Sequence, residues 1–152
     1  MTDLNLLGKQ AVAAKYEMQL LGTQEKNHGL LKAAEKLLEK REEILSANER
    51  DIRRGEENGM HPGLIDRLRL NDARIEAMAE GLRQIVELPD PIGDEMEAFV
   101  RPNGLKISRV RVPLGVIGII YESRPNVTAD AFGLCFKSGN AVILKGGSDA
   151  IE

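Results

Sequence analysis

Cysteine, tryptophan and long apolar runs are scarce in this chain. Of its 152 residues, one is Cys and none is Trp. A single cysteine has no partner for an intramolecular disulfide, and the N-terminal MTDLNLLGKQ lacks the basic segment and apolar stretch of a secretory signal. The longest apolar run, Leu114 to Tyr121, has eight residues, whereas a membrane-spanning helix needs roughly 20. We therefore expect a soluble, cytoplasmic protein with no membrane partner.

A large net charge is also missing. The formal charge is −3 and the isoelectric point is about 5.5, so no strong field attracts nucleic acid, and none is expected as a partner. His28 and His61 are isolated and lack metal-ligand spacing with the cysteine, so no metal site is expected. Cys135 lies in an apolar helical pattern, which favours an unreactive core thiol over a nucleophile.

Charged residues are concentrated in the first half of the chain. Between positions 23 and 60, 17 of 38 residues are Asp, Glu, Lys or Arg, against 7 of 40 between positions 113 and 152. Apolar residues there recur at every third or fourth position, which places them on one helix face. The pattern and its caps predict a first helix over 3–21 and a second from Thr23 to Gly59, with a restart at Ser46. A third helix is predicted from Pro62, and a fourth over 72–86 after Asn71. Residues 1–90 are therefore expected to form a helical part.

The segment 91–112 is predicted to be a linker and a β-hairpin. Two prolines and a glycine between positions 88 and 93 end the helical pattern. Two extended runs, 98–101 and 105–112, then flank Asn103-Gly104, which is a strong hairpin signal. Because the apolar positions change parity within the second run, we expect a β-bulge near Ser108-Arg109.

Residues 113–152 have the pattern of a βαβ unit. The β-branched run Val116 to Tyr121 is typical of a central strand covered on both faces. Thr128 is the expected cap of a helix that ends at Gly139, and 141–145 is a second buried strand. The predicted fold class is α/β: a helical layer, a β-hairpin, and the first βαβ unit of a parallel sheet that two strands leave incomplete.

Two loops follow the carboxyl ends of the predicted strands, where open α/β sheets bind ligands. Neither loop contains a G-x-G-x-x-G or G-x-x-x-x-G-K-[ST] motif. In the second loop Lys145 favours a cofactor with a 2′-phosphate, although a strand end can also carry a solvent-facing lysine. Gly146 and Gly147 allow a close backbone approach or form an ordinary turn. We expect the two loops to lie side by side.

The first loop, Tyr121 to Asn126, is polar. Arg124 can pair with a phosphate or carboxylate, and Ser123 and Asn126 add hydrogen-bonding groups. The alternative places Arg124 in a surface ion pair and Asn126 in an Asx-turn. Glu122 is a candidate acid or base only where a substrate reaches it.

The segments Val112 to Thr128 and Lys137 to Ser148 strongly resemble the gamma-glutamyl phosphate reductase family, within the aldehyde dehydrogenase superfamily. The superfamily pattern is P-x-G-V-x-G-x-I followed by G-N-x-V-x-x-K, and the segment 122–126 narrows the resemblance to the reductases. The similarity extends over the helical part and covers about the N-terminal third of a family member. It implies a cofactor domain of the aldehyde-dehydrogenase type that lacks the usual glycine motif.

The resemblance also implies a function. It implies NADPH-dependent reduction of L-glutamyl 5-phosphate to L-glutamate 5-semialdehyde, with release of phosphate, in proline biosynthesis, through a cysteine thioester. Arg124 and Asn126 are the candidate substrate-binding residues. Aldehyde dehydrogenases place an oxyanion-stabilising Asn just after the first cofactor strand, but here the segment is one residue shorter, which leaves that role unassigned, with Asn126 as the nearest amide. The cysteine is expected downstream, so the chain alone is expected to be inactive. The implied partners are further copies of the chain and, as a candidate, glutamate 5-kinase. The resemblance implies that Lys145 contacts the adenosine ribose and 2′-phosphate and that Ser148 lies near further cofactor contacts. With the other candidates of the two loops, the predicted cofactor-binding residues are Lys145, Gly146, Gly147, Ser148, Glu122 and Ser123.

A second class of function stays open at this point. A noncatalytic, truncated interaction module would associate with a complete enzyme through the hairpin and an unpaired strand edge, because exposed edges invite pairing.

Overall fold

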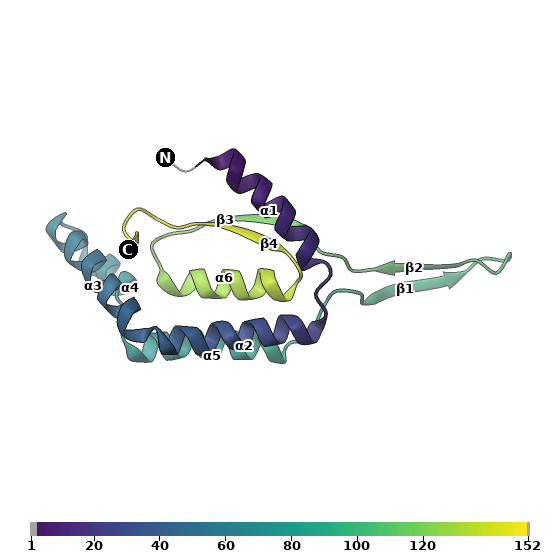
Figure 1. Ribbon diagram of the computed structural model, residues 1–152, viewed down its shortest axis with the longest axis horizontal. Coiled ribbons are helices and arrows are strands. Elements are labelled where there is room, and N and C mark those ends of the chain that lie inside the picture. The colour runs from purple at the N-terminus through teal and green to yellow at the C-terminus, as the bar shows by residue number, and fades with distance from the viewer. Residues whose placement is uncertain (1–2, 152) are drawn as a thin grey trace.

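In the computed structural model, which describes residues 3–151, the first half is helical, and the second half contains two strand pairs and one further long helix (Figure 1). None of the helices in this range is long and apolar enough to span a membrane. The elements in chain order are α1 (Leu4–Met18), α2 (Thr23–Glu39), α3 (Arg41–Glu57), α4 (Pro62–Leu68), α5 (Asp72–Glu87), β1 (Glu95–Val100), β2 (Lys106–Val110), β3 (Val116–Ile120), α6 (Pro125–Lys137) and β4 (Ala141–Lys145).

Helix α6 lies between the β3–β4 strand pair and the layer formed by α2 and α5 (Figure 1). Helix α1 is separate from that layer and contacts β4 and β3 instead. The predicted α/β class, with its helical layer, hairpin and βαβ unit, is confirmed. The main core cluster lies between α2 and α5 and is covered by two aromatic rings of α6; its members are Leu30, Ala34, Ala79, Leu82 and Ile85, with Phe132 and Phe136 against them.

Two glycines let α6 approach its neighbours closely. A Cβ atom on Gly133 would lie 2.7 Å from side-chain atoms of both Leu82 and Ile85 of α5. A Cβ on Gly29 of α2 would lie 2.9 Å from the ring of Phe136. Both distances are too short for a real side chain, so glycine sets the helix spacing.

Local capping chemistry places several helix ends where the sequence predicts them. The side chain of Asn71 accepts a hydrogen bond from the Arg74 amide at 2.8 Å at the start of α5. Pro62 begins α4, as predicted, and His61 caps this helix through Nδ1, which accepts from the Gly63 amide at 3.1 Å. Gly59 and Gly139 follow α3 and α6 with φ of 71°, the left-handed conformation that glycine adopts without strain.

Other predicted helix boundaries are wrong. Helix α1 ends at Met18 rather than position 21. The second helix begins at Thr23, but its cap is Gly22, whose amide donates to Glu25 at 2.7 Å. The predicted helix is interrupted at Lys40, whereas Ser46, where a restart was predicted, lies inside α3.

The physical reason for the break at Lys40 is the packing of α3 on α4. The buried side chain of Asn48 donates to the carbonyl of Leu68 at 2.8 Å and accepts from the amide of Leu70 at 2.7 Å. These contacts fix α3 in a new direction (Figure 1). A Ser-x-x-Glu spacing therefore does not interrupt the helix when tertiary contacts hold it.

The hairpin forms at Asn103-Gly104, as predicted. Strands β1 and β2 pair antiparallel, and Gly104 has φ of 84° in the connecting turn. The bulge is in β1, between Glu95 and Glu97, and not at Ser108-Arg109. Every residue of both strands is exposed, so no buried face enforces the side-chain alternation on which the predicted position depended. The hairpin projects from the rest of the molecule (Figure 1).

Strands β3 and β4 pair in parallel, from Val116 opposite Ala141 to Ile120 opposite Lys145, as the βαβ pattern predicts. The buried Asn140 side chain accepts from the Gly115 amide at 2.8 Å and so joins the starts of the two strands. The prediction that β3 is central and covered on both faces is wrong for residues 3–151. Here β3 has β4 as its one neighbour, and Ile120 is 86% exposed.

The predicted cap of α6 is also misplaced. The helix begins at Pro125 after Arg124, because the fixed φ of proline suits the first helical turn and its missing amide hydrogen is not needed there. Thr128 lies within the helix, and its hydroxyl is 2.6 Å from the Tyr121 hydroxyl. This contact ties α6 to the loop after β3.

Candidate functional site

The two loops after β3 and β4 lie side by side, as the strand order predicts. The Tyr121 amide donates to the Lys145 carbonyl at 3.1 Å, which extends the parallel pairing beyond the strands. The Ser123 hydroxyl donates to Asp149 at 3.3 Å. The carboxyl edge of the strand pair therefore brings residues 121–126 and 145–149 together.

Gly147 is required for this close approach. A Cβ at this position would lie 2.2 Å from the Ser123 Oγ and 3.1 Å from the Ser123 amide nitrogen. A Cβ on Gly146 would make an ordinary contact with the Tyr121 ring and hydroxyl. Neither glycine has a positive φ. The predicted close backbone approach therefore occurs at Gly147, whereas the position of Gly146 has room for a side chain.

Lys145 carries a positive charge at this edge. Its side chain is exposed, and its ammonium donates to the carbonyl of Gly146 at 2.6 Å. Within residues 3–151 no carboxylate lies within ion-pair distance of it. The charge is therefore free to meet an anion. Ser148 is exposed and lines a small cavity of about 330 Å³ together with Arg54 of α3 and Asn58, the residue that follows this helix.

Arg124 and Glu122 form the surface ion pair that the sequence allowed as the alternative. Arg124 Nε is 3.6 Å from the Glu122 carboxylate, and both side chains are exposed. Asn126 is in the first turn of α6 rather than in an Asx-turn, and its amide nitrogen donates to Asp130 at 3.4 Å. These groups remain near the surface and are accessible to a ligand.

Arg124 and Asn126 also line a cavity that the sequence analysis missed. It has a volume of about 450 Å³ and lies between α4, α5 and the start of α6. The sequence feature that could have indicated this cavity is the arginine-containing segment from position 66 to 74. Its pattern is also typical of an ordinary solvated helix surface. This cavity, called the basic cavity below, is lined by Asp66, Arg67, Arg69, Leu70, Arg74, Ala77, Met78, Arg124, Asn126 and Asp130.

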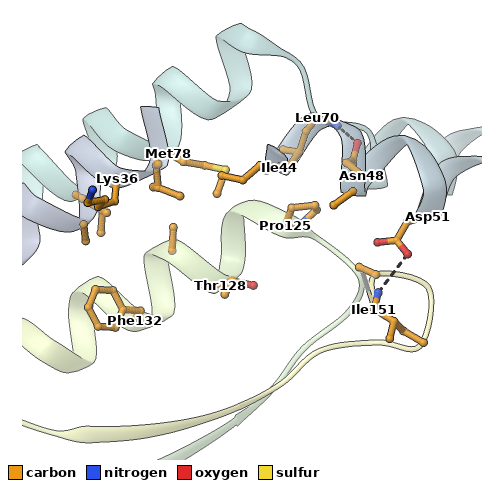
Figure 2. Close-up of a pocket in the computed structure, with 16 residues that line it drawn as sticks. Lys36, Ile44, Asn48, Asp51, Leu70, Met78, Pro125, Thr128, Phe132 and Ile151 are labelled. Atoms are coloured by element: carbon orange, nitrogen blue, oxygen red, sulfur yellow. Dashed lines mark hydrogen bonds between the residues drawn. The ribbon is translucent and has the colours of Figure 1, made fainter. Parts of the chain in front are cut away.

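A larger groove of about 680 Å³ lies on the other side of the first turns of α6, where Pro125 and Thr128 face α3 and α5 (Figure 2). Its walls are mostly apolar. Of its polar side chains, Asn48 is bonded to the backbone around Leu70, and Asp51 accepts from the Ile151 amide at 3.3 Å (Figure 2). This groove is suited to packing. Its exposed polar side chains Lys36 and Thr128 are hydrogen-bonded to Glu39 and Tyr121.

Cys135 is buried in α6, where the sequence analysis expected a core thiol. Burial raises the pKa of the thiol, which lowers its reactive thiolate fraction. In the part of the chain that the structure describes, no three His, Cys, Asp or Glu side chains are placed to hold a metal ion.

A buried ion pair lies outside the site. Lys26 and Asp90 are 2.5 Å apart, with side chains 2% and 11% exposed. Burial alone would raise the pKa of the Asp90 carboxyl. Hydrogen bonds from Lys26, the Ile92 amide and Thr23 outweigh it, and the pKa is lowered. The pair ties α2 to the linker after α5.

Lys137 at the end of α6 joins the same region. Its ammonium donates to Asn27 at 2.6 Å and to the Val86 carbonyl at 3.0 Å, and burial lowers its pKa. These bonds hold α2, α5 and α6 together and indicate a structural role.

Comparison with known proteins identifies relatives of this chain. No protein-family model matches it. The gamma-glutamyl phosphate reductases of Caldanaerobacter subterraneus and Heliobacterium modesticaldum are 54% and 57% identical to it, over 99% of this chain and 36% of each relative. The relative from Brucella anthropi is 55% identical over 95% of the chain and 34% of its own length. The chain therefore spans little more than a third of these curated relatives.

Solved structures agree with the sequence comparison. Gamma-glutamyl phosphate reductase from Thermotoga maritima matches with a TM-score of 0.92 and 48% identity, over 93% of this chain and 34% of that chain. The Saccharomyces cerevisiae enzyme matches with a TM-score of 0.88 and 33% identity, over 99% of this chain and 38% of that chain. PnpE was solved in complex with nicotinamide adenine dinucleotide. It is 23% identical, with a TM-score of 0.70 over 95% of this chain and 27% of that chain, and it shares the fold. In sequence and fold, the chain is similar to gamma-glutamyl phosphate reductases over about 36% of their length.

Proposed function

We propose that this chain is part of an NADPH-dependent reductase that converts L-glutamyl 5-phosphate into L-glutamate 5-semialdehyde and phosphate. The support is the identity of more than 50% to curated reductases over almost the whole chain. The structural observation that carries the proposal is the contact between the loops after β3 and β4, beside the Lys145 ammonium, which has no ion-pair partner within residues 3–151. In this proposal residues 113–152 begin the cofactor-binding core.

The residues at the strand edge fit a phosphorylated dinucleotide. The Lys145 ammonium would pair with the 2′-phosphate, because a charge-assisted hydrogen bond to phosphate is stronger than a neutral one. Gly147 lets the two loops approach each other closely at Ser123, and the exposed Glu122 and Ser148 can supply further hydrogen bonds. The dinucleotide bound by the structurally similar PnpE supports this class of cofactor. When bound, NADPH supplies the hydride for the reduction.

The substrate carbonyl would lie near Arg124 and Asn126 at the start of α6. In the mechanism implied by the family resemblance, a cysteine thiolate displaces phosphate from the acyl phosphate, and a thioester forms. Cys135 does not suit this role because it is buried and its pKa is raised. The proposed nucleophile therefore lies outside these 152 residues. The Asn126 amide is the candidate donor to the carbonyl oxygen.

A titration with NADPH tests the cofactor assignment. Lys145→Glu replaces the cation with an anion at an exposed position, and we expect the dissociation constant for NADPH to rise roughly tenfold or more. The constant for NADH should change much less, because NADH lacks the 2′-phosphate. Lys9→Glu is the matched control, an exposed lysine on α1 with no ion pair among residues 3–151. Equal effects of the two substitutions on NADPH binding would refute the assignment.

The exposed hairpin favours a second candidate, a noncatalytic interaction module. All residues of β1 and β2 are exposed, and apolar side chains such as Phe99 and Val100 lie among them. Under this alternative neither the unsubstituted chain nor Lys145→Glu binds NADPH, and the chain associates with a complete reductase.

A further inference from the structure

The basic cavity contains a cation and an anion that do not pair with each other. Arg67 on α4 is exposed, and within residues 3–151 its guanidinium has no ion-pair partner. Asp130 on α6 is half-buried, and its carboxylate accepts one long hydrogen bond, from Asn126 at 3.4 Å. Both residues line the same cavity of about 450 Å³, yet they are more than 4.0 Å apart. The space between them is open to a ligand.

The other charged groups of the cavity already have partners. Arg74 donates to the carbonyls of Asp66 and Arg69 at the end of α4, and it also contacts the Asp66 carboxylate. Arg69 pairs with Glu56 at 3.6 Å, outside the cavity lining. Arg124 pairs with Glu122. The two unmatched charges, Arg67 and Asp130, are therefore the groups that a ligand could satisfy.

We propose that the basic cavity binds the α-amino acid group of the substrate. Arg67 pairs with the α-carboxylate, and Asp130 accepts hydrogen bonds from the α-ammonium. This inference rests on the proposed reductase function and adds the recognition of the amino-acid end to it. An L-amino acid carries these two charges on one carbon atom, so one small ligand would match both groups, and a bidentate arginine–carboxylate pair would fix its orientation.

The position of the cavity suits a substrate whose other end reacts. Arg124 and Asn126 line it and belong to the chain segment after β3. That segment contacts the loop after β4, where the cofactor is proposed to lie. A side chain extending from the amino-acid group past Asn126 would therefore lead toward the cofactor edge.

Calorimetric titration with L-glutamate and with glutarate, which lacks the α-amino group, tests this inference on the 152-residue chain. Arg67→Gln should weaken the binding of both probes roughly tenfold or more. Asp130→Asn should weaken the binding of L-glutamate to a similar extent and leave the binding of glutarate unchanged. Arg109→Gln on the hairpin is the matched control, because Arg109 is also exposed and has no ion pair among residues 3–151, and it should bind both probes normally.

Several outcomes would overturn the inference. These are an unsubstituted chain with no saturable L-glutamate binding, equal binding by Arg67→Gln and Arg109→Gln, or an Asp130→Asn variant that does not distinguish the two probes. Displacement of L-glutamate by inorganic phosphate at equal concentration would instead assign the cavity to the phosphate end. The Lys145→Glu titration is independent. An unsubstituted chain that binds L-glutamate but no NADPH would remove the proposed reductase and retain the amino-acid site.

Discussion

At the scale of single residues, Cys135 and the Lys26–Asp90 pair show how burial sets chemistry. Cys135 is 6% exposed and its pKa is raised by loss of water around the thiolate. Asp90 is similarly enclosed, but its hydrogen bonds lower its pKa. The Cys135 thiol is therefore unreactive, whereas the Asp90 carboxylate stays ionised.

Cys135 is expected to react slowly in the folded chain. At pH 8 we expect alkylation by iodoacetamide to be roughly tenfold or more slower than in the urea-unfolded chain, because the thiolate is the nucleophile and burial limits both its population and its access. Mass spectrometry of the alkylated fraction over time gives both rates. Equal rates in the two states would show that the thiol is exposed and reactive.

Replacement of Asp90 should destabilise the fold and change its acid response. Asp90→Asn leaves Lys26 buried without a counter-charge, so we expect the free energy of unfolding at pH 7 to fall by about 3 kcal/mol. The folded pKa of Asp90 lies below its usual 3.8. The stabilisation by its carboxylate is therefore present above pH 3.8 and is lost as the pH falls through the folded pKa.

Urea unfolding at several pH values checks this prediction. The difference between Asp90→Asn and the unsubstituted chain should shrink below pH 3.8, where the Asp90 carboxyl becomes protonated. Asp94→Asn is the control, because Asp94 is exposed and its nearest cation, Arg111, is 3.9 Å away. A pH-independent difference would contradict the role of the carboxylate.

At the scale of elements, helix α6 is positioned by glycine contacts with two other helices. Gly133 lies against Leu82 and Ile85, so Gly133→Ala must push α6 away from α5. We expect a loss of about 1–3 kcal/mol in the free energy of unfolding, the usual cost of overpacking a core. Gly8→Ala in α1 is the control, because nothing lies within 4 Å of its added Cβ.

The two alanine substitutions should have opposite signs. Gly8→Ala should stabilise by about 0.5–1 kcal/mol, because alanine is the better helix former. Chemical denaturation of both variants measures the difference. A neutral Gly133→Ala would show that α6 and α5 have room to separate.

The hairpin is proposed to mediate association between copies of the chain. Phe99 is 45% exposed on β1, and the Arg101 guanidinium lies over its ring at 5.6 Å. If the hairpin pairs with a second copy, Phe99→Lys should shift sedimentation toward the monomer by adding charge to the apolar surface. Lys106→Arg keeps the charge on β2 and should leave the distribution unchanged. Identical profiles for Phe99→Lys and the unsubstituted chain would contradict the proposal.

Elements were predictable where the determining chemistry is local. Asn71, Pro62, Gly59 and the Asn103-Gly104 pair mark boundaries through their own caps and turns, and the structure has these boundaries in place. The break at Lys40 was not predictable from capping residues, because the contacts of Asn48 with residues 68 and 70 decide it. Such contacts join positions about 20 apart in sequence.

At the scale of the whole molecule, the candidate site was only partly predictable. The order strand, helix, strand was enough to place the loops at 121–126 and 145–148 together. The basic cavity was not predictable, because Arg67 and Asp130 line one cavity only when α4 and α5 pack beside α6. The family resemblance implied cofactor residues in these loops but did not indicate this cavity.

The central claim is that both loops hold one molecule of NADPH. The most direct test is amide NMR of the chain during titration with NADPH. The account predicts that Ser123 and Gly147 shift together, with one dissociation constant, and that Lys145→Glu weakens both responses. Shifts confined to other parts of the molecule, or separate constants for the two loops, would contradict it.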